Sequence, residues 1–328
     1  MSRRKNWITP VALFVCTVIL FVLPQARAGE NNTAQIVPGH FHFRTFQGPS
    51  EFVLSVEDIN NFGTVVGSYE LGTVSSPGPF RGFELTPFGK QLTLVDPRDQ
   101  QLSTDPDGGF TQVYGLNDLG VIVGEYYNSA AGHYAGFFLF NGKYTTFNVP
   151  GYFNTGVYGI SNSYDFVGLV QTGAPDFFSS AFISDHGKIT TFTIPGATYT
   201  QAAAINNLGE VLGYYFDTNN VVHAFLRDRK GKLTYPIDVP GVTTASGLGT
   251  VPLGINDFGA ISGHFWDASL AEHGFVRTAS GRFYQIDVPN ASATSGGGLN
   301  NFGVVVGHYN DQSGNQFGYI AIPDCDLE

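Results

Sequence analysis

Short stretches of the chain place apolar or small residues at every second position. The clearest carry an aliphatic residue, a glycine and an aromatic ring in alternation, as in Ile122, Gly124 and Tyr126. Side chains two residues apart share one face of a β-strand, so this spacing predicts strands with one buried face. No stretch after the N-terminal segment shows sustained apolar spacing of three and four residues, the pattern of amphipathic helices. The pattern therefore predicts an all-β protein.

One phrase recurs along the chain. Residues 115–128 read GLNDLGVIVGEYYN, and close variants begin at Gly254 and Gly298. Five copies keep an Asn-Asx-x-Gly turn, at 59–63, 116–120, 205–209, 255–259 and 299–303, and a degenerate copy begins at Gly159. The copies are spaced by about 44 to 50 residues with one longer gap, which is typical of propellers and other repeat arrays.

Each copy predicts four short antiparallel strands. In the second copy they are 111–117, 121–128, 134–140 and 143–150, and Asn141-Gly142 is a strong hairpin signal between the last two. Four such strands make one propeller blade. The glycine within the second strand predicts that something large approaches it closely, and we expect an aromatic ring from the neighbouring sheet. A single unit cannot bury that face, so the units should stack.

The two ends of the chain predict how the array is completed. The last copy stops after its third strand, at 316–322, whereas HFHFRTFQGP at 40–49 resembles a fourth strand. We therefore predict a six-bladed β-propeller of four-stranded antiparallel blades, its ring closed by the N-terminal strand, which leaves no exposed sheet edge. The alternative is an open row of six sheets with a loose N-terminal strand. The third copy lacks the Asn-Asx-x-Gly turn, so we expect its blade to be distorted.

The N-terminus has the pattern of an export signal. Arg3, Arg4 and Lys5 precede an apolar run at 11–24, and Ala26-Arg27-Ala28 fits a signal peptidase site. We expect residues 1–28 to be removed, residues 29–38 to form a short linker, and 39–328 to form one domain outside the cytoplasm, extracellular or periplasmic. An uncleaved anchor is the alternative. Cys16 leaves with the signal, so Cys325 has no partner within the mature chain.

Charge limits the classes of partner. Removal of the four signal Lys/Arg from the sixteen leaves twelve basic against 27 acidic residues, a net charge of −15. Such a chain should repel phosphates, so we expect no nucleic acid partner, poor affinity for anionic lipid, and no stable membrane insertion after cleavage.

Few residues suggest chemistry. Asp58 stands where other copies hold a small residue near the central axis, and Glu57 precedes it. The two acids are candidates to bind a ligand or cation at the channel mouth; the alternative is a solvated pair. Asp105 and Asp107 lie in an acidic turn that is a second candidate. A Ca²⁺ loop there lacks a third carboxylate and a glutamate at position twelve. None of the eight histidines has zinc-site spacing, and we expect no cofactor.

The repeated phrases, such as GINDFG at 254–259 and His223-Ala224-Phe225, resemble the HAF family of bacterial extracellular repeats. The resemblance covers 40–328; it implies the repeat architecture and assigns no reaction. Our interpretation is an exported noncatalytic propeller that serves as a binding or scaffold module for a protein or glycan. The alternatives are a carbohydrate hydrolase or lyase with acids at the channel, because fold alone does not exclude catalysis, and a structural component of the cell envelope.

Overall fold

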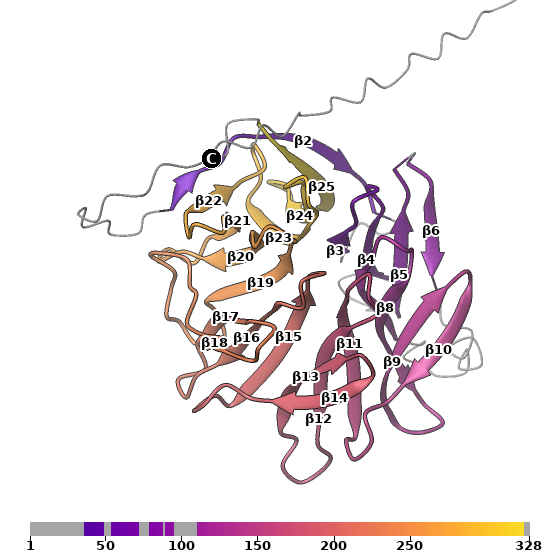
Figure 1. Cartoon of the computed structure of the whole chain (residues 1–328). Coiled ribbons are helices and arrows are strands. Elements are labelled where there is room, and N and C mark those ends of the chain that lie inside the picture. Colours follow the sequence, from indigo (N-terminus) through magenta and orange to yellow (C-terminus); the bar gives the residue numbers. More distant parts are fainter. Residues whose placement is uncertain (1–35, 49–53, 72–78, 88, 95–109, 325–328) are drawn as a thin grey trace, which may run out of the picture.

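The computed structural model describes residues 36–48, 54–71, 79–87, 89–94 and 110–324. Every regular element in these ranges is a β-strand and none is an α-helix, which confirms the all-β prediction (Figure 1). The same ranges accordingly contain no helix long and apolar enough to cross a membrane. The predicted signal at 1–28, the acidic turn with Asp105 and Asp107, and Cys325 lie outside the described residues.

The strands pair into antiparallel units of four, as the repeat predicts. The first unit holds β3 (Leu54–Ile59), β4 (Val65–Glu70), β5 (Phe80–Leu85) and β6 (Gln91–Leu94). The second holds β7 (Thr111–Leu116), β8 (Ile122–Asn128), β9 (His133–Phe140) and β10 (Lys143–Phe147). The third holds β11 (Asn154–Ile160), β12 (Phe166–Gln171), β13 (Ser179–Asp185) and β14 (Lys188–Phe192).

The remaining strands repeat the scheme. The fourth unit holds β15 (Tyr199–Ile205), β16 (Val211–Phe216), β17 (Val222–Arg227) and β18 (Leu233–Thr234), and the fifth holds β19 (Thr250–Ile255), β20 (Ile261–Trp266), β21 (Glu272–Arg277) and β22 (Phe283–Ile286). One parallel pair, Ser179 with Tyr199, joins the third and fourth units into a single hydrogen-bonded sheet. The units surround a common centre, and their first strands lie nearest to it (Figure 1).

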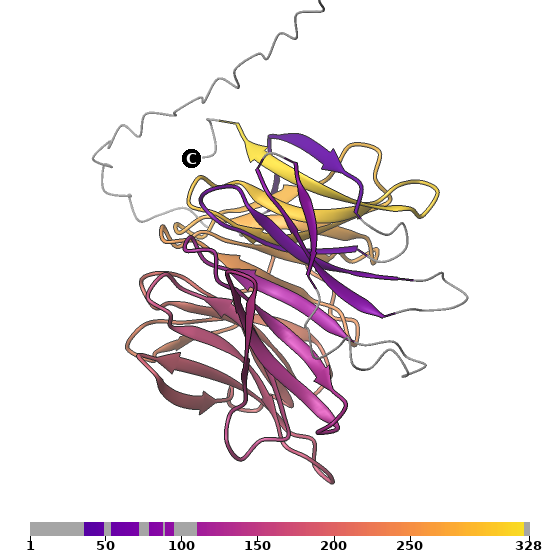
Figure 2. The same cartoon turned by 90° about the vertical axis from the view of Figure 1, so that its right-hand side faces the viewer.

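The last unit combines both ends of the chain. It holds β23 (Ala293–Leu299), β24 (Val305–Asn310) and β25 (Gln316–Pro323), and its fourth strand is β2 (Phe41–Phe46), which pairs from Phe41↔Pro323 to Phe46↔Gly318. Figure 2 shows indigo β2 beside the yellow C-terminal strands. The predicted pairing of the N-terminal strand with 316–322 is confirmed. A two-residue strand, β1 (Val37–Pro38), adds to β22 in parallel.

Apolar side chains are buried between neighbouring units. Val66 of the first unit packs with Val113 of the second, and Leu212 of the fourth with Ile255 of the fifth. Val306 of the last unit packs into the cluster of the first. Because each cluster draws on two units, no unit buries its apolar face alone.

The glycine of each second strand is covered from within its own sheet, which corrects our expectation of a ring from the neighbouring sheet. Gly124 pairs with Phe137 on the adjacent third strand, and a Cβ on Gly124 would lie 2.8 Å from that ring and 2.0 Å from the Gln112 carbonyl oxygen. The corresponding pairs are Gly67–Phe83, Gly168–Phe182, Gly213–Phe225, Gly263–Phe275 and Gly307–Tyr319. All six rings are fully buried. The third-strand aromatic folds over the missing side chain because it is the directly opposite residue in the register.

The Asn-Asx-x-Gly turns join neighbouring units by side-chain hydrogen bonds. Asn117 Oδ1 accepts the N–H groups of Leu119 and Val121 at 3.1 and 3.0 Å, which caps its own turn. Asn117 Nδ2 donates to the carbonyl of Ser161 in the next unit at 3.0 Å. The same amide-to-carbonyl bond runs from Asn60 to Asn117, Asn206 to Asn256, Asn256 to Asn300 and Asn300 to Asn60.

The second residue of each turn forms a parallel series. Its N–H donates to the side-chain Oδ1 of the next unit, successively through Asn61, Asp118, Asn162, Asn207, Asp257, Asn301 and back to Asn61. Asp118 and Asp257 each also accept an Nδ2 bond from the asparagine on either side, at 2.8 to 2.9 Å. We call both series together the asparagine ring, and the end of the sheets that carries it the turn face.

The third unit is not distorted, contrary to the expectation from its degenerate turn. Its four strands pair like the others, and Ser161 Oγ accepts the N–H groups of Ser163 and Asp165 at 3.2 Å in place of an asparagine oxygen. Tyr164 adopts a positive φ of 66° where the other turns hold glycine. What Ser161 lacks is the amide group that would donate to the fourth unit.

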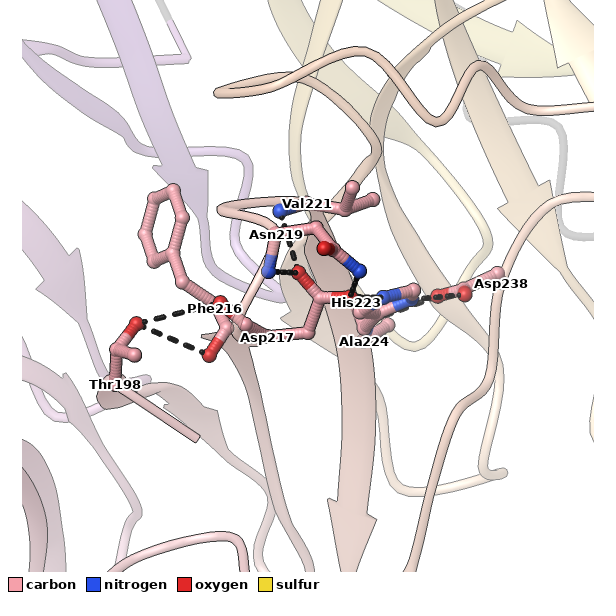
Figure 3. A network of polar contacts seen from close by, with 8 residues as sticks. All are labelled: Thr198, Phe216, Asp217, Asn219, Val221, His223, Ala224 and Asp238. Carbon is pink, nitrogen blue, oxygen red and sulfur yellow. Dashed lines mark hydrogen bonds and ion pairs between the residues drawn. The ribbon is translucent and has the colours of Figure 1, made fainter. Parts of the chain in front are cut away.

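A histidine fixes the opposite end of two units, which we call the loop face. In Figure 3, His223 Nδ1 lies 2.6 Å from Asp238 in the connection to the next unit, and Nε2 lies 3.7 Å from Asp217 in the turn between β16 and β17. His273 repeats the arrangement with Asp287 at 2.7 Å and Asp267 at 3.6 Å. The histidine of the His-Ala-Phe phrase therefore joins the turn between the second and third strands to the connection that leads to the next unit.

Candidate functional site

A β-bulge interrupts the first strand of every unit near the centre of the molecule. The regular pairing skips Glu57, Tyr114, Tyr158, Ala203 and Leu253 in the first five units, and Gly297-Gly298 in the last. A bulge leaves its extra residue unpaired and redirects the side chain. All five of these non-glycine residues line one cavity.

This cavity, which we call the chamber, has a volume of about 380 Å³. Its other walls come from the same first strands and from two second strands, through Ser55, Tyr199, Gln201, Tyr214 and His264. Four of its ten lining residues are tyrosines, which makes the walls both aromatic and polar. A second, smaller hollow of about 80 Å³ lies on the turn face within the asparagine ring.

The chamber tyrosines stack in pairs. The rings of Tyr114 and Tyr158 are 4.3 Å apart and nearly parallel, at 25°, and those of Tyr199 and Tyr214 are 6.0 Å apart at 22°. The Tyr199 hydroxyl donates to Gln201 Oε1 at 2.5 Å. These contacts hold the aromatic walls in place before any ligand arrives.

A carboxyl group lies behind Tyr114. The Tyr114 hydroxyl is bonded to Glu125 Oε1 at 2.9 Å and also to Gln112 Oε1. A hydroxyl has only one proton to donate, so both bonds are complete when Glu125 is the protonated partner. Burial raises the pKa of Glu125 to about 7, against the lowering effect of the Tyr114 bond, so this protonated form is well populated near neutral pH.

Glu57 is the residue that brings a carboxyl group to the chamber wall itself. Burial raises its pKa to about 7, and the hydrogen bond donated by the Ser55 hydroxyl opposes that shift. Across the chamber, His264 Nδ1 faces the carbonyl of Gly296 at 3.2 Å, and burial lowers its pKa. Burial also lowers the pKa of nearby His308 to about 4. Near neutral pH the chamber wall thus carries a neutral His264 and a Glu57 that gains or loses a proton.

The structure separates the two acids that the sequence paired. Glu57 faces the chamber, whereas Asp58 lines the smaller hollow. The Asp58 carboxyl accepts the N–H of Ile59 at 2.8 Å and that of Leu116 in the second unit at 3.2 Å, so it ties the first two units together. Burial raises its pKa to about 7, against those two bonds. Asp105 and Asp107 lie outside the described residues.

Sequence reasoning missed the tyrosines and Glu125. The available signal was the residue three places before the turn asparagine or serine. Glu57, Tyr114 and Tyr158 hold this position, directly before the small or acidic residue that begins the repeated phrase. Nothing in the sequence showed that a bulge turns this position toward the axis.

Three ligand-type side chains meet on the turn face. Within the described part of the chain, Asp165, Asp185 and His186 bring their ligand atoms within 4.8 Å of one another. Their contacts are already satisfied: His186 Nδ1 lies 2.7 Å from Asp185, and the His186 N–H donates to Asp165 at 2.7 Å. Arg229 also lowers the pKa of Asp185, so a resident guanidinium supplies positive charge here.

No protein-family model and no curated protein sequence matches the chain. Among solved structures it is similar to TolB from Acinetobacter baumannii, with a TM-score of 0.50 and 11% identity over 78% of this chain and 63% of that one. It is also similar to the Aleuria aurantia lectin in complex with Fucα1-6GlcNAc, with a TM-score of 0.51 and 12% identity over 84% and 98% of the two chains. A Trypanosoma rangeli sialidase matches at 0.48 and 11% identity, over 88% and 59%. The chain thus spans less than two thirds of the TolB and sialidase chains, and at these identities the likeness supports a β-propeller-like fold.

Proposed function

We propose that this chain is an exported, noncatalytic six-bladed β-propeller of the HAF type, closed by its N-terminal strand, that binds the end of a glycan in its chamber. Closure is supported by the bonds from Asn300 to Asn60 and from Asn301 to Asn61, which link the last unit to the first. The antiparallel pairing of β2 with β25 supports a complete, four-stranded last blade.

One observation carries the choice of ligand: four tyrosines and several hydrogen-bonding side chains surround a chamber of about 380 Å³. That volume lies within the range of about 300–1,000 Å³ usual for small-ligand sites. A sugar ring presents C–H faces, which pack on aromatic rings, and hydroxyl groups, which pair with carboxyl, amide and imidazole groups. Gln201, Glu57 and His264 supply those groups around the tyrosine walls. The similar Aleuria lectin was solved with a disaccharide, so a comparable scaffold carries this class of ligand.

A carbohydrate hydrolase is the second candidate, and the two glutamates favour it. Glycoside hydrolysis needs one carboxyl group protonated and one ionised at the same pH. Glu57 and Glu125 both have a pKa of about 7 and both meet at Tyr114, one as a neighbour on the chamber wall and one through its hydroxyl.

The test is a glycan array on purified 29–328, followed by calorimetry with the best ligand. We expect Tyr158→Ala to weaken binding about fivefold to tenfold, since stacking contributes roughly 1–1.5 kcal/mol per aromatic contact. Tyr164→Ala is the matched control, because Tyr164 is exposed on the turn face. Loss of binding in both variants, or in neither, contradicts the chamber as the site. Release of product from chromogenic glycosides that Glu57→Gln abolishes would instead establish the hydrolase.

A further inference from the structure

The turn face exposes a set of large apolar side chains at equivalent positions. The third residue of each Asn-Asx-x-Gly turn is between 49% and 71% exposed, and these residues are Phe62, Leu119, Leu208, Phe258 and Phe302. The turns use the asparagine before this residue for their hydrogen bonds and the glycine after it for its positive φ, whereas no turn hydrogen bond uses the third side chain. Solvent exposure of five such residues is a cost unless they meet a partner.

These side chains form one annulus. The asparagine ring holds consecutive turns side by side, so their third residues follow one another around the smaller hollow. The third unit has Ser163 at this position, but Tyr164, which is 54% exposed, stands next to it. We call Phe62, Leu119, Tyr164, Leu208, Phe258 and Phe302 the apolar crown. Because the turns are alike and lie at equivalent ends of the units, the crown residues lie at a similar height above the sheets.

Basic residues border the crown. The hairpins between third and fourth strands lie on the same face and pack on the turns: a Cβ on Gly209 would lie 3.4 Å from the Arg229 side chain, and one on Gly259 3.5 Å from Ala279. Nine of the chain's sixteen lysines and arginines lie in or beside these hairpins. Each hairpin from the first to the fifth unit carries an exposed base, namely Lys90, Lys143, Lys188, Arg229 with Lys232, and Arg282.

The acids of the turn face are directed into the protein. Asp118 and Asp257 accept asparagine amides, Asp165 accepts the N–H of His186, Glu210 accepts Asn206 Nδ2, and Asp228 accepts the N–H of Lys232. Asp185 is exposed and pairs with His186. Burial raises the pKa of the Glu84 carboxyl, and the charge of Lys90 opposes that rise only in part. The outer surface of this face is therefore more positively charged than the numbers of acidic and basic residues on it suggest.

We propose that the turn face is a docking surface for an anionic lipid bilayer. An annulus of phenylalanine and leucine at one level can enter the headgroup region together, as the apolar face of an interfacial segment does. Basic residues around it then lie at the height of the lipid phosphates, where each contributes about a threefold to fivefold gain in partitioning. The crown residues do not line the chamber, so the two sites are distinct.

The net charge of the whole chain does not oppose this contact. Strands of six residues are about 20 Å long, and the Debye length at physiological ionic strength is about 8 Å. Acids of the loop face, such as Asp217, Asp238 and Asp267, are thus screened from a bilayer at the turn face. Our expectation of poor affinity for anionic lipid followed from net charge alone, and the distribution of charge reverses it.

A second copy of the chain fits the crown less well. Face-to-face association would bring the basic hairpins of one copy against those of the other, because the same face is used twice. A bilayer offers the crown an apolar layer and offers the hairpins opposite charge. Self-association is therefore an outcome that the experiment separates from docking.

The experiment measures co-sedimentation of purified 29–328 with vesicles of phosphatidylcholine alone and with about one third phosphatidylglycerol. We expect partitioning at least about tenfold stronger on anionic vesicles, reduced by high salt. F62S/F258S/F302S should lower it on the order of 100-fold, because each phenylalanine loses its apolar contact. R229E/K232E should lower it and remove most of the salt dependence.

F177S/F178S is the matched control, because these exposed phenylalanines lie in the turn between β12 and β13 on the loop face. It should bind like the unsubstituted chain, and thermal unfolding should confirm that all variants fold. The proposal is overturned if the chain does not bind vesicles, if the crown variant binds undiminished, or if light scattering shows a dimer that the crown variant abolishes. Glycan binding in the chamber should survive in the crown variant, so the two proposals fail separately.

Discussion

The asparagine ring and the chamber are built from neighbouring residues of the same six turns and strands, yet they follow opposite rules. In the ring, the first turn position is asparagine in five of the six units, and each of these asparagines repeats one hydrogen bond to the next unit. In the chamber, the equivalent bulge positions hold Glu57, Tyr114, Tyr158, Ala203 and Leu253, which are acidic, aromatic or aliphatic.

This difference separates scaffold from site. A position that must make the same hydrogen bond in successive units is restricted to few types of side chain, so the same residue recurs there along the repeat. A bulge residue makes no ladder bond and points at the axis, so its side chain is free to differ. Unlike side chains around one axis make an asymmetric cavity, and an asymmetric cavity can select a ligand.

The largest effect should come from the buried framework that supports both regions. Gly124→Ala places a Cβ 2.0 Å from the Gln112 carbonyl oxygen and 2.8 Å from Phe137. We expect a loss of at least about 3 kcal/mol in the free energy of unfolding, measured by denaturant titration, because the Gln112 backbone and the buried Phe137 ring must both move. Gly142→Ala, where nothing lies within 4 Å but φ is positive, should cost only about 1 kcal/mol. Equal costs would show that the glycine–aromatic pair has no special role.

The ring should be the next most sensitive region. Asn117→Ala removes the acceptor for two N–H groups and the donor to Ser161, and we expect a loss of about 2–4 kcal/mol in unfolding free energy. Asn117→Ser keeps an acceptor, as Ser161 does in the third unit, and should lose about half as much. If serine and alanine are equally destabilising, the cap within the turn does not contribute as we describe.

The buried glutamates at the chamber should make the stability of the protein depend on pH. Burial raises the pKa of Glu57 and Glu125 from 4.5 to about 7, so the folded protein retains protons that the unfolded chain has lost. Stability should therefore fall as pH rises from about 4.5 to 7 and level off above, by about 1–3 kcal/mol for each group after allowance for partial solvation.

The measurement compares unfolding free energies at pH 5 and pH 8. Glu57→Gln and Glu125→Gln should each be more stable than the unsubstituted chain at pH 8 and should flatten the curve. Bonding to Asp287 raises the pKa of His273, whose contribution is present below about pH 6.5 and is also lost as pH rises. The contribution of His273 is the same in all variants. The comparison therefore uses the difference in unfolding free energy between each variant and the unsubstituted chain. A curve unchanged by either substitution contradicts the assignment.

The smallest expected effect tests the one irregular member of the ring. Ser161→Asn should supply the missing amide donor toward the fourth unit and raise the free energy of unfolding by about 0.5–1.5 kcal/mol. Asn219→Ser, in an exposed turn on the loop face, is the control and should change little. A loss of stability in Ser161→Asn would indicate that the third turn is fitted to serine.

The sequence by itself determined the strands, the four-stranded units and the pairing of the N-terminal strand with the last copy. Period-two spacing, turn signals and an incomplete final repeat are local properties, and local properties can be read in order along the chain. Asp58 was also found from the sequence, because it breaks a repeated small-residue position, and Glu57 was found beside it.

Only the tertiary structure decided which ring covers each glycine, that Glu57 and Asp58 face different hollows, and that Tyr114, Tyr158, Tyr199, Tyr214 and Glu125 gather around one of them. The physical reason is that a bulge shifts the side-chain alternation by one residue, and a pattern of apolar and polar letters does not record that shift. The chamber also draws on residues from several units, and their distances are set by packing between sheets that no single repeat contains.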